Sequence, residues 1–373
     1  MLVMKNVIKV YRYFLTYGVR RTIIKISGRK NILFLKVFFP ELLLKKSKIV
    51  SLVGCGQFGF SSISFFLLKN IGNRFLDCYD IDEANSTRTS LFWGYNISRS
   101  FDELIANSDC RVVYISSNHA SHTDYAIRAL RAGKTVYVEK PISVSRAQFG
   151  KLLRTLKGEK YEGKFFVGYN RPFSKAIKQV VEKIRNGFSP ITYSAVVAGH
   201  FLSENHWYRN PEEGSRICGN VGHWIDLGVH FLFARGYCPD EFFVTISYSN
   251  VSVTDDNLSI AITSEFGDLL SIILTSRHEP LEGIDESIVL QTDRLYAKID
   301  DFRRLTMWQD LSKKSFRYWP KDVGHSSAVV QPFSSVGRNL KEVKISTFLM
   351  IELAEMVKKG CNKGSIKLNE DIY

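Results

Sequence analysis

Short apolar runs alternate with helix-like segments between residues 48 and 140. The runs are rich in β-branched residues and bounded by glycine or polar residues, which is typical of buried strands. Strands are expected at 49–53, 75–79, 112–115 and 135–138. Helices are expected around 65–68 and near 82–91, 101–107 and 121–132. Strands that alternate with helices predict a parallel sheet with right-handed crossovers.

The pattern changes after about residue 170. A helix is expected near 174–187, followed by a strand at 191–197. Apolar and polar residues then alternate over 242–249, 257–264, 269–275, 286–291 and 295–299. This alternation predicts a largely antiparallel sheet with one exposed face, and a last helix is expected at 345–358. The body therefore divides into residues 47–170 and 171–373, preceded by a separate segment, 1–46.

The N-terminal segment is strongly basic, whereas the body is nearly neutral. Residues 1–48 contain twelve Lys or Arg and one acid, Glu41, so they carry +11 of the net charge of +14. A nucleic-acid-binding body would carry its own basic face, so no nucleic-acid partner is expected. Basic and apolar residues alternate in 1–46, which leaves two interpretations open. The segment either packs on its own domain or a partner subunit, or lies as an amphipathic helix on an anionic membrane.

Composition narrows the class of protein. The 373 residues are 45% hydrophobic and 24% charged, which is ordinary for a folded protein with about two domains. No apolar run is long enough to suggest a spanning helix. The six cysteines form no CxxC pair and no secretory signal is recognised, so reduced thiols, no metal site and a cytoplasmic location are expected.

A glycine-rich turn follows the first strand. Gly54, Gly56 and Gly59 form GxGxxG directly after a strand and before a helix, the context in which this motif binds a dinucleotide. The first glycine permits the tight turn, the second lets the backbone approach a pyrophosphate, and the third lets the helix pack closely on the strand. Asp80 ends the second strand, where a carboxylate accepts the ribose hydroxyls and opposes a 2′-phosphate. No arginine follows directly, so NAD is favoured over NADP.

Further motifs carry a resemblance to a known family. Val138-Glu139-Lys140-Pro141 ends the last strand of this half, and Ala129-Leu130-Arg131-Ala132-Gly133-Lys134 precedes it. These two motifs resemble segments of the glucose–fructose oxidoreductase/inositol dehydrogenase family (Gfo/Idh/MocA). Four further segments share the resemblance, which extends over about residues 47–360: 117–122, 168–174, Asn205-His206-Trp207 and 219–226. The resemblance implies a Rossmann domain with a doubly wound parallel sheet. It also implies a C-terminal α/β domain with a large, mostly antiparallel open sheet, through which family members pair as homodimers or homotetramers.

The resemblance also implies the site. Lys140 would reach the substrate hydroxyl beside the nicotinamide. Expected cofactor-binding residues are Gly54, Gly56, Gln57, Phe58, Gly59, Asp80, Ser117, Asn118, His122, Glu139, Lys140 and Arg171. Expected substrate-binding residues are Tyr169, Trp207, Asn220 and Asp226. Ser117 and Asn118 replace the family's Thr-Pro.

Two histidines compete for the role of general base. If residues 219–226 are aligned with the family's segment, His223 takes the place of the family's histidine. Gly219 then stands where the family often has a catalytic Asp. If residues 226–230 are aligned with it instead, Asp226 and His230 take the places of the family's Asp and His. These two residues are four apart and share one face of a helix. His223 is preferred because the residues before it fit the family better.

The expected activity is oxidation or reduction of a secondary alcohol of a sugar or cyclitol with NAD. The motifs favour a nucleotide sugar in surface polysaccharide biosynthesis. The alternative is a catalytically inactive NAD-binding regulatory or scaffold protein on the same fold, because function depends on the site and not on the fold.

Overall fold

The computed structural model describes residues 2–44, 46–157, 159–161, 163–250, 252–281 and 283–368. By their contacts, these residues divide into two compact units. The parallel-sheet unit comprises residues 18–169 and 325–338. The antiparallel-sheet unit comprises residues 2–17, 170–324 and 339–368.

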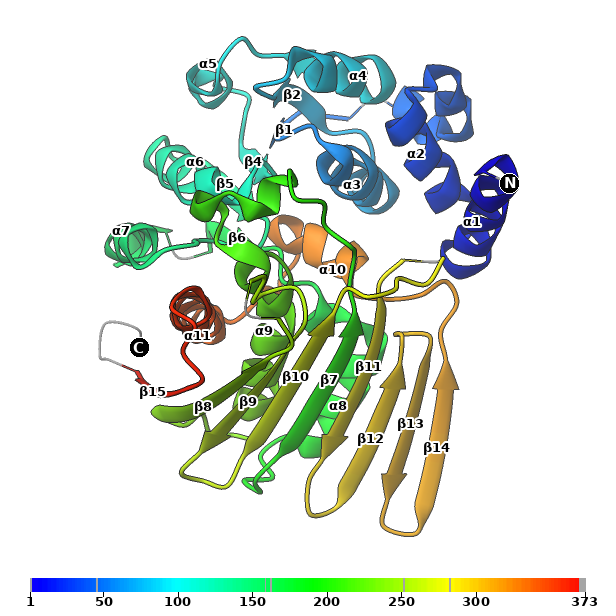
Figure 1. The fold of residues 1–373 in the computed structure, drawn as a ribbon. Helices are drawn as coiled ribbons and strands as arrows, with labels where there is room; N and C mark the ends of the chain where they lie inside the picture. The colour runs from blue at the N-terminus through cyan, green and yellow to red at the C-terminus, as the bar shows by residue number, and fades with distance from the viewer. Residues whose placement is uncertain are drawn as a thin grey trace. The chain divides into compact units, whose positions relative to one another are not determined.

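In its described residues, the parallel-sheet unit contains one six-stranded parallel sheet in the order β3-β2-β1-β4-β5-β6 (Figure 1). The strands are β1 (Val50–Val53), β2 (Phe75–Tyr79), β3 (Asn96–Ile97), β4 (Val112–Ile115), β5 (Thr135–Val138) and β6 (Phe165–Val167). Every residue of β1 and β4 is buried, which is typical of a parallel sheet covered on both faces. The four predicted strands are confirmed. The short β3 and β6 were not predicted, because two or three residues carry too little pattern.

Five of the described helices of this unit connect successive strands, whereas α2 precedes β1 and α10 follows β6. The helices are α2 (Val19–Lys30), α3 (Ser64–Ile71), α4 (Glu83–Trp93), α5 (Phe101–Ala106), α6 (His119–Arg131), α7 (Arg146–Leu156) and α10 (His325–Val329). Single turns are η1 (Leu33–Phe38), η2 (Pro40–Leu43), η3 (Gly59–Ile63), η4 (Glu159–Tyr161) and η9 (Gln331–Phe333). Polar side chains begin several helices: the Asp82 carboxylate accepts the Ala84 N–H at 3.0 Å at the start of α4.

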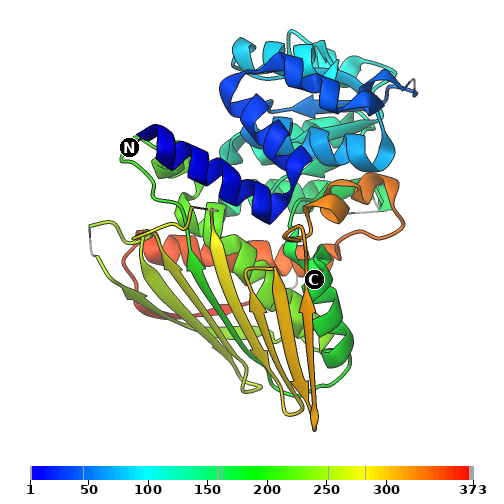
Figure 2. The same ribbon diagram turned by 90° about the vertical axis from the view of Figure 1, so that its right-hand side faces the viewer.

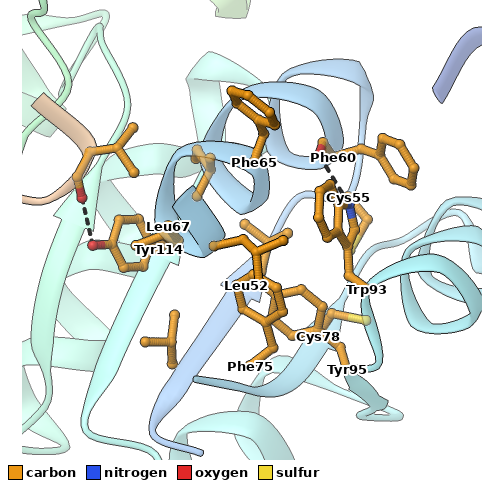
Figure 3. Packing of buried hydrophobic residues seen from close by; sticks show 14 of the residues in the cluster. Leu52, Cys55, Phe60, Phe65, Leu67, Phe75, Cys78, Trp93, Tyr95 and Tyr114 are labelled. Atoms are coloured by element: carbon orange, nitrogen blue, oxygen red, sulfur yellow. Dashed lines mark hydrogen bonds between the residues drawn. The ribbon is translucent and has the colours of Figure 1, made fainter. Parts of the chain in front are cut away.

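Aromatic side chains fill the core between β1, β2 and the helices beside them (Figure 3). The indole Nε1 of Trp93 donates to the carbonyl oxygen of Phe60 at 3.1 Å, so this large buried side chain leaves no unpaired donor. The hydroxyl of Tyr114 donates to the Val329 carbonyl at 2.6 Å. This bond ties residues 325–338 to the parallel sheet.

Part of the basic N-terminal segment belongs to this core. Ile24 of α2 and Phe39 are fully buried within the same cluster, and the Phe39 ring lies edge-on to Trp93 at 5.7 Å. The only acid of the segment, Glu41, accepts two hydrogen bonds from Arg20, both at 2.8 Å. Residues 18–44 therefore pack as part of the parallel-sheet unit.

The antiparallel-sheet unit contains, in its described residues, one nine-stranded sheet in the order β14-β13-β12-β11-β7-β10-β9-β8-β15 (Figure 1). Only β7 and β10 run parallel within that described sheet. The strands are β7 (Thr192–Ala198), β8 (Glu241–Tyr248), β9 (Leu258–Ser264), β10 (Leu269–Thr275), β11 (Asp285–Gln291), β12 (Leu295–Asp300), β13 (Arg304–Gln309), β14 (Ser312–Arg317) and β15 (Lys363–Lys367). Burial alternates along most of them, so the predicted half-exposed sheet is confirmed.

Helices of this unit are α1 (Leu2–Tyr17), α8 (Lys175–Ile184), α9 (Gly222–Ala234) and α11 (Leu340–Lys358), with single turns η5 (Arg171–Phe173), η6 (Trp207–Arg209), η7 (Pro211–Glu213) and η8 (Ile217–Val221). Helices α8 and α9 pack on the sheet, and α11 packs on α9 (Figure 2). Gly222 permits this close approach, because a Cβ there would lie 2.7 Å from the sulfur of Met350.

The start of the last helix and the strands β13, β14 and β15 differ from the prediction. The last helix begins at Leu340, five residues early, because the Asn339 side chain accepts the Lys341 N–H at 2.9 Å and starts the helix there. Strand β14 was missed because its sequence, Ser-Lys-Lys-Ser-Phe-Arg, has no apolar alternation. It is an exposed edge strand, where charged side chains discourage pairing with another chain.

Candidate active site

The three glycines of the turn after β1 have distinct surroundings. Gly54 has φ +86°, and a Cβ there would lie 2.4 Å from the backbone of Ser116 and Ser117. A Cβ on Gly59 would lie 2.2 Å from the carbonyl oxygen of Gly54, so only glycine allows this helix start to pack on the turn. A Cβ on Gly56 would meet no atom within 4 Å. The turn is thus closed on two sides and open at Gly56.

Asp80 follows β2 beside this turn. Its carboxylate accepts the backbone N–H of Cys55 at 2.6 Å and that of Asp82 at 2.9 Å. Two backbone donors hold the charge at the mouth of the turn. Ile81, the next residue, is 83% exposed.

Gln57 and Phe58 begin the helix that follows the turn. The Gln57 side chain lies against α2, since a Cβ on Gly28 would be 3.0 Å from both of its amide atoms. Within the described residues, its buried Nε2 has no hydrogen-bond partner. The Phe58 ring lies 5.6 Å from the ring of His325.

His122 of α6 joins two loops at the edge of the parallel sheet. Its Nδ1 lies 2.8 Å from the carbonyl oxygen of Pro141, and its Nε2 lies 3.0 Å from that of Ser117. Burial lowers the pKa of His122 to about 4, although both carbonyls favour its charged form. At this pKa the imidazole is neutral at physiological pH and carries one N–H, so it donates to one of the two carbonyl oxygens and holds that loop against α6. Asn118 Oδ1 accepts the Ser121 hydroxyl at 2.8 Å and orders the adjacent loop.

Glu139 and Lys140 lie directly beyond the end of β5. The Glu139 carboxyl group is 5% exposed and accepts the Tyr137 hydroxyl at 2.8 Å. Burial raises the pKa of Glu139 to about 7, against the opposing effects of Tyr137 and of the Lys140 charge. The Lys140 charge also lowers the pKa of His122, so its ammonium group lies near both side chains. Tyr169, shortly after β6, is 1% exposed.

In the antiparallel-sheet unit, His223, Asp226 and His230 lie on α9 at spacings of three and four residues, which places them along one side of the helix. Asp226 is fully buried and accepts the Ser346 hydroxyl at 3.0 Å. His230 Nδ1 lies 2.8 Å from Glu342 Oε2. Both partners come from α11, which therefore orients two of the three candidates.

Arg171 has a buried partner. Its Nε and Nη2 each donate to the Glu286 carboxylate at 2.7 Å, and its guanidinium lies 4.9 Å from the Trp224 ring centre. Burial tends to raise the pKa of Glu286, but the Arg171 charge and hydrogen bonds outweigh this and hold the pKa below its usual value. Two of the guanidinium donors are thus occupied within this unit.

Asn220, one of the residues expected to bind substrate, belongs to a polar network. Asn220 Oδ1 accepts a hydrogen bond from Arg216 Nε at 3.3 Å. Arg216 is 1% exposed and also donates to Asp256 at 3.0 Å and to the His200 carbonyl at 2.9 Å. Trp207 in η6 is 39% exposed.

The predicted site residues form two sets, one in each unit. The first set borders the carboxyl edge of the parallel sheet, and the second lies on α9 and the loops around η5 to η8. The sequence did not reveal their partners Glu286, Glu342 and Ser346. Each is separated from its partner by 112 to 120 positions along the chain, and no local pattern indicates such contacts.

The described residues contain neither a membrane-spanning helix nor a cluster of metal ligands. Across the described ranges, no helix is both long and apolar enough to cross a membrane. In the same ranges, no group of three or more His, Cys, Asp or Glu side chains could hold a metal ion. None of the six cysteines, all of which lie in the described ranges, is in a disulfide.

Comparison with known proteins agrees with this geometry. Residues 48–169 match the model of an oxidoreductase family with an NAD-binding Rossmann fold. An inositol 2-dehydrogenase of Gluconacetobacter diazotrophicus is 26% identical over 160 residues, which cover 42% of this chain and 45% of that protein. The matched segments thus span about half the length of the curated relatives or less.

Solved structures extend the likeness in fold to most of the chain. A levoglucosan dehydrogenase in complex with NADH and levoglucosan has a TM-score of 0.70 at 14% identity, covering 87% of this chain and all of that one. A 3-ketoreductase from Actinomadura kijaniata, in complex with NADP and TDP-benzene, has a TM-score of 0.67 at 14% identity, covering 85% and 98%. The predicted α/β fold class is confirmed. Residues 48–169 therefore have the fold and the sequence pattern of the NAD-binding Rossmann domain of the Gfo/Idh/MocA oxidoreductase family.

Proposed function

We propose that the protein is an NAD-dependent dehydrogenase that acts on a secondary hydroxyl of a sugar or cyclitol. The observation that carries this proposal is the arrangement at the carboxyl edge of the parallel sheet. There a phosphate-binding turn, a fixed Asp80 and Lys140 all follow strand ends of one sheet. Ligands of open α/β sheets bind at this edge.

The turn fits a dinucleotide. The space beside Gly56 is open, so a pyrophosphate can approach the backbone and the N–H groups of the following helix. Asp80 would accept the adenosine ribose hydroxyls. Since Asp80 is held by two backbone N–H groups, its charge would remain close to a 2′-phosphate and repel it. These contacts support NAD over NADP.

The side chains supply proton chemistry and orientation. When bound, NAD accepts the hydride from the carbon that carries the hydroxyl. Lys140 would donate a hydrogen bond to the reacting oxygen and stabilise its developing negative charge. A histidine would take the proton, because its unperturbed pKa lies near neutrality.

His223 is the better candidate for the general base. The residues before His223 match the family segment better than those before His230. His230 contacts Glu342 through Nδ1, a contact that joins α9 to α11. Asp226, three residues after His223, would orient that histidine or bind a sugar hydroxyl. Trp207, half-exposed in η6, would stack on the sugar ring.

The substrate we propose is a nucleotide sugar of surface polysaccharide biosynthesis, used in the cytoplasm. The second candidate function is an inactive NAD-binding regulatory protein, favoured by one observation: Gly219 stands where the family often has its catalytic Asp. NADH formation should be measured with UDP-, GDP- and dTDP-sugars, free sugars and inositols. Turnover with one class would support the dehydrogenase, whereas NAD binding without turnover on any substrate would support the regulatory protein.

Assembly is a further part of the proposal. The open face of the large sheet exposes apolar side chains: Val196, Phe243, Ile273, Tyr296 and Trp308. A second copy of the chain would cover them in a homodimer or homotetramer. Equilibrium sedimentation of the wild type and of Trp308→Glu tests this, since a charge on the contact face would shift the assembly towards monomer.

Helix α1 supports a peripheral membrane contact. It exposes Met4, Val7 and Tyr11 together with Lys9 and Arg12, a combination that suits an anionic lipid surface. Co-sedimentation with phosphatidylserine vesicles should fall in Val7→Glu. Equal sedimentation of this variant and the wild type would exclude a membrane role for α1.

A further inference from the structure

Helix α2 lies along the helix that begins at the dinucleotide-binding turn, and both belong to the parallel-sheet unit (Figure 1). Near the start of α2, Arg21 donates to the carbonyl oxygen of Ser61, and its guanidinium lies 4.8 Å from the ring centre of Phe66. Near the end of α2, Gly28 lies against Gln57. The carboxyl end of α2 is therefore the end beside the turn.

Arg88 of α4 fixes this placement. Its Nη1 donates to the carbonyl oxygen of Gly28 at 3.1 Å, and its Nη2 donates to that of Cys55 at 2.8 Å. One guanidinium group thus joins α2 to the turn. Cys55 is also the residue whose N–H is bound by Asp80, so α2 ends beside the expected adenosine and pyrophosphate positions.

Three cations follow the face of α2 that meets the turn. Arg21, Lys25 and Arg29 are four residues apart and share one side of the helix. Because Arg21 and Gly28 both contact the neighbouring helix, Lys25 between them faces the segment from Gln57 to Ser61.

The charge of Lys25 is not balanced by an acid. Burial and the nearby charges of Arg29 and Arg21 lower the pKa of Lys25 to about 8, and no acidic group among the described residues offsets them. Helix α2 itself contains no acidic residue, and Glu41 is bound to Arg20. A partly buried cation without an anion destabilises a fold, so a ligand that supplies the anion would account for its presence.

We infer that Lys25 and Arg29 bind the pyrophosphate of the dinucleotide, which makes α2 of the basic N-terminal segment a wall of the cofactor site. The inference rests on the proposed dinucleotide site at Gly54–Gly59. The pyrophosphate brings negative charge to the open side of Gly56, next to Gln57, which α2 contacts. Because the pyrophosphate is common to NAD and NADP, these cations strengthen the binding of both.

The test compares the full-length protein with Lys25→Met and Arg29→Met, and with Lys69→Met as a control that removes an equal but exposed charge from α3. Dissociation constants for NADH and NADPH are measured by ligand fluorescence at several salt concentrations. Lys25→Met should raise both constants about tenfold and weaken their salt dependence. Because the Arg29 side chain is exposed, Arg29→Met should raise the two dissociation constants less. Lys69→Met should leave them unchanged.

Thermal unfolding without ligand separates binding from folding. Lys25→Met should keep or raise the Tm, because it removes a partly buried charge that no acid balances, while Lys25→Arg should retain NADH binding. The inference would be overturned if Lys25→Met had the wild-type dissociation constant for NADH. It would also be overturned if Lys25→Met lost affinity for NADPH alone. If the wild type itself bound no NADH, the proposed function would fail first, so the two failures are distinguishable.

Discussion

Gly56 and Gly59 are three residues apart in one turn, yet alanine should affect them in opposite ways. A Cβ on Gly59 would lie 2.2 Å from the carbonyl oxygen of Gly54 and 2.8 Å from the hydroxyl of Ser116. The nearer atom belongs to the backbone and cannot rotate away. Forcing a methyl group into such a contact costs about 1–3 kcal/mol of unfolding free energy.

Gly56→Ala should leave the fold intact. Its Cβ meets no atom within 4 Å, and its φ is not in the left-handed region. A glycine-to-alanine change at a compatible site stabilises a protein by about 0.4–1 kcal/mol, through the unfolded chain. The same methyl group would occupy the space that the pyrophosphate needs, so the NADH dissociation constant should rise at least about tenfold, or 1.4 kcal/mol.

Urea unfolding and NADH fluorescence titration of both variants test this contrast. Gly59→Ala should lose stability, and Gly56→Ala should lose binding without losing stability. Wild-type NADH affinity in Gly56→Ala would refute the assignment of the turn as a phosphate site. An equal loss of stability in the two variants would refute the packing argument.

Three other substitutions have defined expectations. Arg171→Met should lower the unfolding free energy by about 3–5 kcal/mol, because it leaves the Glu286 charge buried, and adding Glu286→Gln should restore most of it. Since the folded pKa of His122 is lowered to about 4, the unfolded state takes up a proton first as the pH falls below about 6.5. Wild-type unfolding free energy should therefore fall by roughly 3 kcal/mol more between pH 6.5 and 4 than that of His122→Gln. Arg216→Met should raise the sugar KM about tenfold without changing the NADH dissociation constant, because Arg216 donates a hydrogen bond to Asn220, a proposed substrate-binding residue.

Local pattern predicted much of the parallel sheet. Strands β1, β2, β4 and β5 are continuous apolar runs because both faces are buried, and their observed limits agree with the prediction within one residue. The glycine turn was equally visible, since its residues are consecutive. Strand β14 was not, because an exposed edge strand needs no apolar face.

Partners that are distant along the chain could not be predicted. The sequence marks His230 and Asp226 but not Glu342 and Ser346, which approach them only because α11 packs on α9. The basic segment is another example. Its pattern left packing on its own domain open beside a membrane surface. The buried Ile24 and the contacts of α2, which show the packing of residues 18–44, depend on the tertiary structure.

The central claim is that Lys140 acts on the substrate of a hydride-transfer reaction. The most direct test measures kcat and NADH binding for Lys140→Met beside Lys151→Met, an exposed control on α7, with the best substrate of the panel. The account predicts that Lys140→Met lowers kcat by about 10²–10³ with an unchanged NADH dissociation constant, and that Lys151→Met behaves as wild type. A Lys140→Met enzyme that retained wild-type kcat would contradict it.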